Sequence, residues 1–287
     1  MGFAETVLLG AIAGFTIYIG LPIGRFHSVD NRVRVALAMF SVGILAFIFM
    51  DVTNHGEAII ASALASFKAG HTGIGHVLGL FALLAGGFTV GTVGIAAIER
   101  PLHRRARALP PIAGGSPEAA LSASELTQYS SAAADAQRRA LQTGMTIALA
   151  IGLHNFAEGL AIGVAAKTGA IGLATVLIIG FGLHNATEGF GIVGPLGGVR
   201  PSWAWLGLAG LVGGGPTFLG TIVGYQVHSN ALELCFYALA GGAILYVVGE
   251  IWTAVRRHGH RTLGLYALAL GFLVGVATDL VVTYGGA

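Results

Sequence analysis

Two stretches decide how this chain folds: IALAIGLHNFAEGLAIG at 147–163 and VLIIGFGLHNATEGFGIV at 176–193. Each carries the pattern His-Asn-x-x-Glu-Gly within an apolar run of the kind that forms membrane-spanning helices. Ionisable side chains are unfavourable in the hydrocarbon core of a bilayer, and where they occur they usually mark a functional site. The repeated pattern therefore predicts both a transmembrane fold and the place where its chemistry occurs.

The composition of the whole chain also indicates a helical membrane protein. Of its 287 residues, 55% are hydrophobic and only 10% are charged, and the mean hydropathy is +0.79. A soluble domain normally carries about 25% charged residues. The lone cysteine, Cys235, excludes an internal disulfide framework and a multi-cysteine metal site. The net charge of +2 gives no reason to expect nucleic-acid binding. We expect one transmembrane domain over 1–287, surrounded by lipid.

Charged residues, proline and glycine divide the chain into eight apolar segments, which predict an all-α fold of eight transmembrane helices. The helices should form a 3+2+3 arrangement in which the fourth and fifth make the core. The predicted spans are 5–23, 33–66, 75–98, 141–166, 170–194, 202–226, 231–254 and 262–284. The second segment is too long for one span and should project beyond the outer face. Between the third and fourth spans we expect a flexible cytoplasmic loop, 99–140, with a short helix at 117–139.

The basic residues predict the orientation in the membrane. All thirteen arginines fall in alternate loops, and the two lysines, Lys68 and Lys167, fall in the loops between them. Because cytoplasmic loops are enriched in basic residues, the arginine-bearing loops should be cytoplasmic and both termini extracytoplasmic. No basic region precedes the first apolar run, so we interpret it as a membrane helix rather than a signal peptide. We expect a multi-pass protein of the cell (inner) membrane.

The two pattern copies are spaced so that their charged groups should meet. On a helix, positions i and i+4 lie on one face, so His154 and Glu158 point the same way, as do His184 and Glu188. If the two spans form an antiparallel hairpin turning near residue 171, residues equally distant from the turn lie level. His154 should then face Glu188, and Glu158 should face His184, near the middle of the membrane.

These groups form a nitrogen and oxygen ligand set that suits a divalent metal cation. Imidazole and carboxylate bind Zn²⁺, and Fe²⁺, Mn²⁺, Cd²⁺ or Ni²⁺ are further candidates. Asn155 and Asn185 would add amide oxygens beside them. Glu250, in the run AILYVVGEIW, is another intramembrane carboxylate and a candidate ligand. The competing interpretation is that His, Asn and Glu form hydrogen bonds that hold the helices together.

A second group of polar residues lies toward the outer ends of the spans. Asp51, His55 and Glu57 are candidate entrance residues that could concentrate cations. Further polar residues in or beside the outer loops are His71, His76, His228 and Glu233. Taken singly, each of these is more typical of an ordinary interfacial residue. Asp279, near the outer end of the eighth span, is expected to snorkel or to face water. His103, among the arginines of the long loop, could bind metal weakly but is more typical of a solvated basic loop.

The two copies resemble the metal-binding core of the ZIP family of zinc/iron transporters, particularly its bacterial members. The family pattern His-Asn-x-Pro-Glu-Gly is matched at His154, Asn155, Glu158 and Gly159, and its counterpart in the next span at His184, Asn185, Glu188 and Gly189. The segment ending in Val-Val-Gly-Glu at 250 resembles the family's seventh span. The eight spans, the external termini and the long third loop agree with the same family.

The resemblance implies a binuclear metal centre. His154, Glu158, His184 and Glu188 would form the first site. Asn155, Asn185 and Glu250 would form the second, with Glu158 and Glu188 bridging the two. The family's proline before the glutamate is replaced by Ala157 in one copy and Thr187 in the other, which changes the expected kink. Thr187 could bend its helix by bonding to a carbonyl one turn earlier.

The leading hypothesis is a transporter, not an enzyme, that moves zinc or a similar divalent cation into the cytoplasm. One alternative is an intramembrane zinc-dependent hydrolase, although the His-Glu-x-x-His signature is absent. Another is a transporter of a non-metal solute in which the motifs are structural contacts. A homodimer is compatible with the sequence, but small residues are too frequent among its 46 glycines to mark a dimer face.

Overall fold

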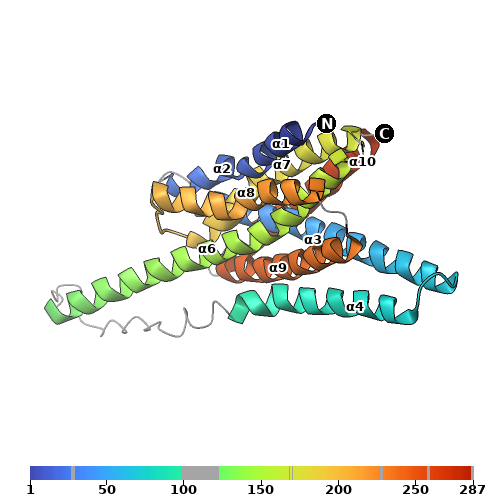
Figure 1. Cartoon of the computed structure of the whole chain (residues 1–287). Helices are drawn as coiled ribbons and strands as arrows, with labels where there is room; N and C mark the ends of the chain where they lie inside the picture. Colours follow the sequence, from blue (N-terminus) through green and yellow to red (C-terminus); the bar gives the residue numbers. More distant parts are fainter. Residues whose placement is uncertain are drawn as a thin grey trace.

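The computed structural model describes residues 1–26, 30–97, 123–167, 169, 171–226, 229–256 and 259–285, and every regular element in these ranges is a helix. The elements are α1 (Phe3–Phe15), α2 (Ile17–Gly20), η1 (Leu21–Arg25), α3 (Asn31–Lys68), α4 (Ile74–Thr89), η2 (Val90–Gly94), α6 (Ala123–Lys167), α7 (Ile171–Val193), η3 (Gly194–Leu196), α8 (Trp203–Gln226), α9 (Asn230–Arg256) and α10 (Arg261–Gly285). The predicted all-α fold is confirmed (Figure 1).

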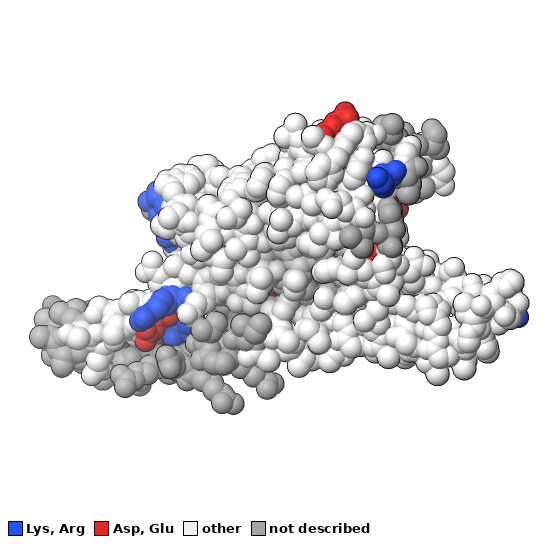
Figure 2. Space-filling model, in the orientation of Figure 1, with Lys and Arg blue, Asp and Glu red and all other residues white. Residues whose placement is uncertain are grey.

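The helices have the length and surface of membrane spans. Seven of them in the described residues are long and apolar enough to cross a bilayer. The remaining predicted span, the fifth at 170–194, coincides with α7, a helix of 23 residues. Leu78 on α4 is 60% exposed and Leu273 on α10 is 62% exposed, as expected for side chains that face lipid. In Figure 2 the Lys, Arg, Asp and Glu side chains gather toward the ends of the molecule. The protein is a polytopic membrane protein.

Two helices are much longer than a bilayer requires. The 38 residues of α3 extend about 57 Å at 1.5 Å per residue, against a hydrocarbon core of about 30 Å. The second apolar segment therefore projects beyond the membrane, as its length predicted. The 45 residues of α6 begin at Ala123, well before the predicted span at 141.

The early start of α6 changes the expected boundary of the long loop. Residues 123–140 include six Ala, two Gln and two Arg, which are strong helix formers, so they continue the fourth span as one helix. The expected short helix at 117–139 is thus part of α6 where it is described. Residues 98–122, including His103, lie outside the described residues.

A tight turn joins the two helices that carry the repeated pattern. Lys167 ends α6, Ile171 begins α7, and Gly169 between them has a φ of 83°. Glycine adopts this left-handed conformation without the steric penalty that a Cβ atom would bring. The turn falls close to residue 171, where the spacing of the two copies placed it, and α6 and α7 pack against each other as the predicted hairpin.

The helices pack as two groups around this hairpin. In one group α6 packs on α8, α1 packs on α8 and α7, and α2 packs on α7. In the other group α3 packs on α10 and α9, and α4 packs on α9. The groups meet where α6 packs on α9 and α3 packs on α7, and Figure 1 shows α6 running between α8 and α9. The order 3+2+3 along the chain therefore folds so that the first and sixth spans lie directly against the central hairpin.

Contacts at the two ends of the bundle agree with the predicted alternation of the loops. At one end Arg25 Nη1 donates to Pro201 O at 2.6 Å, which joins the first and fifth loops. At the other end the Lys167 ammonium lies 5.0 Å from the centre of the Tyr225 ring, and Tyr225 Oη donates to Met1 O at 3.3 Å. The N-terminus thus lies beside the fourth loop, on the side opposite Arg25.

Candidate metal centre

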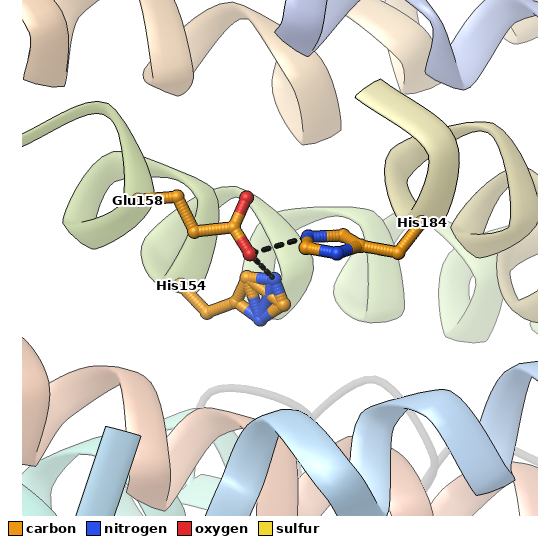
Figure 3. A group of neighbouring side chains, drawn as sticks. All are labelled: His154, Glu158 and His184. Carbon is orange, nitrogen blue, oxygen red and sulfur yellow. Dashed lines mark hydrogen bonds and ion pairs between the residues drawn. The ribbon is translucent and has the colours of Figure 1, made fainter. Parts of the chain in front are cut away.

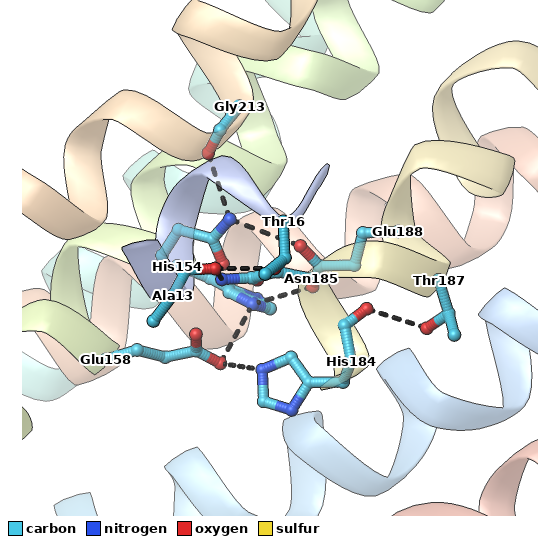
Figure 4. Close-up of polar contacts among 10 residues, drawn as sticks. Ala13, Thr16, His154, Glu158, His184, Asn185, Thr187, Glu188 and Gly213 are labelled. Carbon is cyan, nitrogen blue, oxygen red and sulfur yellow. Dashed lines mark hydrogen bonds and ion pairs between the residues drawn. The ribbon is translucent and has the colours of Figure 1, made fainter. Parts of the chain in front are cut away.

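The two pattern copies meet as their spacing predicted. His184 Nε2 lies 2.6 Å from Glu158 Oε1, and His154 Nε2 lies 3.0 Å from Glu188 Oε1 (Figure 4). His154 Nε2 also lies 3.3 Å from Glu158 Oε1, within its own helix (Figure 3). Ligand atoms of His154, Glu158 and His184 all lie within 4.8 Å of one another. The hairpin therefore brings imidazole and carboxylate groups to one point.

The four groups form two layers with different surroundings. Glu158 and His184, here called the cavity pair, line a cavity of about 730 Å³. His154 and Glu188, here called the sealed pair, are both 0% exposed and do not line it. The two layers share the same residue types at the same spacing, so their difference in access comes from the helices around them.

Several polar atoms at this point are buried without a hydrogen-bond partner. They are His154 Nδ1 and Nε2, Asn155 Oδ1, Glu158 Oε2, Asn185 Oδ1 and Glu188 Oε1. His154 Nε2 is close to both carboxylates, but its ring is not aligned for a hydrogen bond to either. Burying such groups unpaired is unfavourable, and each of these atoms can serve as a ligand to a cation. The residues therefore fit a divalent cation.

The two asparagines are fixed by helices outside the hairpin. Asn155 Nδ2 donates to Gly213 O on α8 at 2.9 Å and to Glu188 Oε2 at 3.2 Å. Asn185 Nδ2 donates to Ala13 O on α1 at 3.2 Å. Both side chains are 0% exposed, and Figure 4 shows Asn185 beside the histidines and glutamates. The asparagines thus connect the centre to α1 and α8.

The glycine that ends each pattern copy packs against the same neighbouring span as the asparagine of that copy. Sequence reasoning did not predict this contact. A Cβ atom on Gly159 would meet Thr217 O of α8, and one on Gly189 would lie 2.7 Å from Ile17 O of the first span. Because Asn and Gly are four positions apart, they share a second helix face. That spacing was the available signal: one face of the pattern carries His and Glu, and the other packs on a neighbouring helix.

The two replacements of the family's proline have defined environments. Thr187 Oγ1 donates to His184 O at 2.7 Å, which confirms the expected bond to a carbonyl one turn earlier. Ala157 is 1% exposed and lines the cavity beside Glu158. Neither position interrupts its helix, since α6 and α7 are continuous through both copies.

The candidate entrance residues divide into two sets. Asp51 and His55 line the cavity, and His55 Nδ1 lies 3.4 Å from Asp51 Oδ1. Glu57 is exposed and does not line the cavity. Glu233 and Asp279 line it together with Asp51. Three carboxylates thus share one cavity with the cavity pair.

His71 and His76, two further outer polar residues, do not line this cavity. They are exposed around the connection between α3 and α4. His228 lies outside the described residues. The structure therefore does not bring His71 and His76 together with the cavity pair.

Glu250 is the one candidate ligand that the structure does not bring to the cluster. It is half-buried on α9, and the described residues give it no hydrogen bond or ion pair. Its neighbour Ile251 packs near Gly191, one turn beyond Glu188 on α7. Glu250 therefore lies near the arginine-bearing side of the centre without contacting it.

Comparison with known proteins agrees with this geometry. A family model described as ZIP zinc transporter matches residues 103–278, which include both pattern copies and most of α8 to α10. The chain belongs to the ZIP family. It is also 33% identical over 143 residues to the zinc transporter ZupT of Clostridium perfringens, a match that covers 47% of this chain and 48% of that protein. The matched region spans about half the length of this curated relative. The resemblance that the sequence suggested is confirmed.

Proposed function

We propose that this ZIP protein transports a divalent metal cation across the membrane. The observation that carries the proposal is the meeting of His154, Glu158 and His184 ligand atoms within 4.8 Å. Two of these residues, Glu158 and His184, line a cavity that Asp51 also lines. A carboxylate and two imidazoles supply ligands, and the cavity supplies access. The family and the named relative, a zinc transporter, support the same activity.

Zinc is the proposed substrate. Imidazole and carboxylate ligands suit Zn²⁺, and Fe²⁺, Mn²⁺, Cd²⁺ and Ni²⁺ remain candidates by the same chemistry. Cys235 lies on α9, outside the cluster, so the described centre offers no thiolate that would favour Cu(I). Several imperfect ligands along a path allow an ion both to bind and to leave, as transport requires.

We further propose that the centre holds two ions. The first position would use His154, His184 and the two glutamates. The second would use the amide oxygens of Asn155 and Asn185, with Glu250 as a further ligand and Glu158 and Glu188 bridging. Support comes from the buried oxygens: Asn155 Oδ1, Asn185 Oδ1, Glu158 Oε2 and Glu188 Oε1 have no hydrogen-bond partner.

The proposed direction is from the cavity to the cytoplasm. The positive-inside pattern places the arginine-bearing loops in the cytoplasm and both termini outside. The cation would enter through the cavity beside Asp51 and His55, reach the cavity pair and pass the sealed pair. The proposed location is the inner membrane of the cell.

Uptake of Zn²⁺ into proteoliposomes tests this function. Removing the carboxylate in Glu158→Ala or in Glu188→Ala should reduce the initial rate at least about 100-fold, since each loses a ligand rather than a supporting contact. Glu57→Ala is the matched control, because Glu57 is exposed and outside the cavity, and it should transport normally. Uptake that persists in both centre variants would overturn the proposal.

A further inference from the structure

The hydrogen bonds of the two asparagines to neighbouring helices are equivalent in the two pattern copies. Asn155 and Asn185 are 30 residues apart, as are all members of the two copies, and their acceptors, Gly213 O and Ala13 O, are 200 residues apart. The glycine contacts repeat the relation, because Gly159 meets Thr217 and Gly189 meets Ile17. Helix α8 therefore makes the same contacts with the first pattern copy that the first span makes with the second copy.

The offset of 200 residues also relates the positions at which α1 and α8 contact each other. A Cβ atom on Gly14 would meet Gly214 O, and one on Gly214 would meet Gly14 O. This reciprocal contact, like the reciprocal His–Glu pairs of the hairpin, is what an inverted repeat places at its axis. Residues 200 apart in the two helices thus have equivalent surroundings.

Both accepting carbonyls lie just before an irregularity in their helix. The first span is interrupted at Thr16, between α1 and α2, and Thr16 Oγ1 donates to Ala13 O at 2.6 Å. Helix α8 contains Pro216, three residues after Gly213. Proline has no N–H for the carbonyl four residues earlier, which here is Val212 O, and its ring displaces the preceding turn, to which Gly213 belongs. Thr16 and Pro216 hold equivalent positions, each three residues after its acceptor.

The irregularities affect how the asparagines present their oxygens. A helical carbonyl normally accepts from the N–H four residues later, and a kink or interruption turns carbonyls outward toward other donors. Asn155 Nδ2 donates both of its hydrogens, one to Gly213 O and one to Glu188 Oε2, so the amide group cannot rotate freely. Asn155 Oδ1 and Asn185 Oδ1 are left buried without a hydrogen bond.

We propose that Thr16 and Pro216 are positioning residues for the second cation position. They set the carbonyls of Ala13 and Gly213, which hold the two asparagine amides so that their oxygens face the ion. The inference rests on the proposed binuclear centre. It also accounts for Ala157 and Thr187: the distortion that prolines would introduce inside the patterns is supplied by the neighbouring helices.

Zn²⁺ binding to the full chain in lipid nanodiscs tests the proposal. Pro216→Ala and Thr16→Val should each weaken the second binding step by about 10-fold to 100-fold, as loss of an orienting contact does at metal sites. The first step should stay unchanged. Controls are Pro195→Ala, a proline at the start of η3, and Thr89→Val, whose hydroxyl donates to Ala85 O on the lipid-exposed α4. Equal weakening of both steps would contradict a positioning role.

Double variants separate positioning from general damage to the fold. In an Asn155→Ala background, Pro216→Ala should have no further effect on the second step, because the side chain that it positions is gone. In an Asn185→Ala background the same change should retain its full effect. Thr16→Val should behave in the opposite way: it should have no further effect in the Asn185→Ala background and its full effect in the Asn155→Ala background. Effects that add equally in both backgrounds would overturn the proposal.

A metal-free structure of Pro216→Ala keeps the test independent of the proposed function. If the wild-type chain bound no zinc, the function would fail, but the positioning role would still predict loss of the Asn155 Nδ2 bond to Gly213 O. Retention of that bond, with Asn155 Oδ1 in its original place, would overturn the positioning role even if zinc transport were established.

Discussion

The cavity pair and the sealed pair consist of the same two residue types, yet only the cavity pair lines the cavity. His184 has a side chain that is 14% exposed, whereas His154 is fully buried. The cavity pair lies nearer the turn at Gly169, in the cavity that α3, α6, α7, α9 and α10 line. The sealed pair lies one helical turn further from that turn. Chemically repeated groups can therefore differ in access because different helices surround them.

The two copies agree in packing even where they differ in access. Each glutamate is followed by a glycine that touches the backbone of a neighbouring helix, Gly159 on α8 and Gly189 on the first span. Access is thus decided on the His–Glu face, while the Asn–Gly face is the same in both copies. The following experiments test each half of this comparison.

The largest expected effect concerns the shared packing. Gly159→Ala and Gly189→Ala should each destabilise the protein by about 1–3 kcal/mol, because the added methyl group meets backbone atoms that cannot yield. Thermal unfolding in nanodiscs would measure the change. Gly79→Ala is the control, since a Cβ atom there meets nothing within 4 Å. Stability retained in either copy would show that the packing is not shared.

The second experiment measures the difference in access. In a Cys235→Ser background, His184→Cys should react with a charged thiol reagent at least about tenfold faster than His154→Cys, because reaction requires exposure of the thiolate. Thr53→Cys, at an exposed position on α3, gives the upper limit of the rate. Equal rates at the two histidine positions would mean that the sealed pair opens to water as readily as the cavity pair.

The smallest expected effect lies at the cavity mouth. Asp51→Asn should raise KM for zinc roughly threefold at low salt and leave kcat unchanged, because one charge fewer attracts cations to the cavity. Glu57→Gln, outside the cavity, is the matched control and should leave both constants unchanged. A fall in kcat with KM unaltered would instead place Asp51 in the transport step.

Much of the centre was predictable because its information is local. The four-residue spacing of His and Glu fixes one face of each helix, and the 30-residue repeat fixes the level at which the copies meet. These rules gave the contacts of His154 with Glu188 and of His184 with Glu158. The extent of α6 was less predictable. The sequence suggested a short helix at 117–139 within a loop, separate from the fourth span, whereas residues 123–140 continue that span as one helix.

Other features depended on segments distant in sequence. Nothing near Asn185 indicates that its amide would bond to Ala13 O, 172 residues away. Asp279 was expected to snorkel or to face water, and only the packing of α10 on α3 and α7 places it in the same cavity as Glu158. Glu250 illustrates the opposite case. Its position within an apolar run suggested a ligand, but in the structure it does not contact the cluster.

The sequence by itself determined the membrane setting, the all-α fold and the ingredients of the cation centre, because hydropathy and helical period act over short distances. The tertiary structure decided which His–Glu layer is accessible and which neighbouring carbonyls hold the asparagines. Those properties arise where helices from opposite ends of the chain touch, and no local pattern encodes the contact between Gly14 and Gly214 or the cavity beside Asp51.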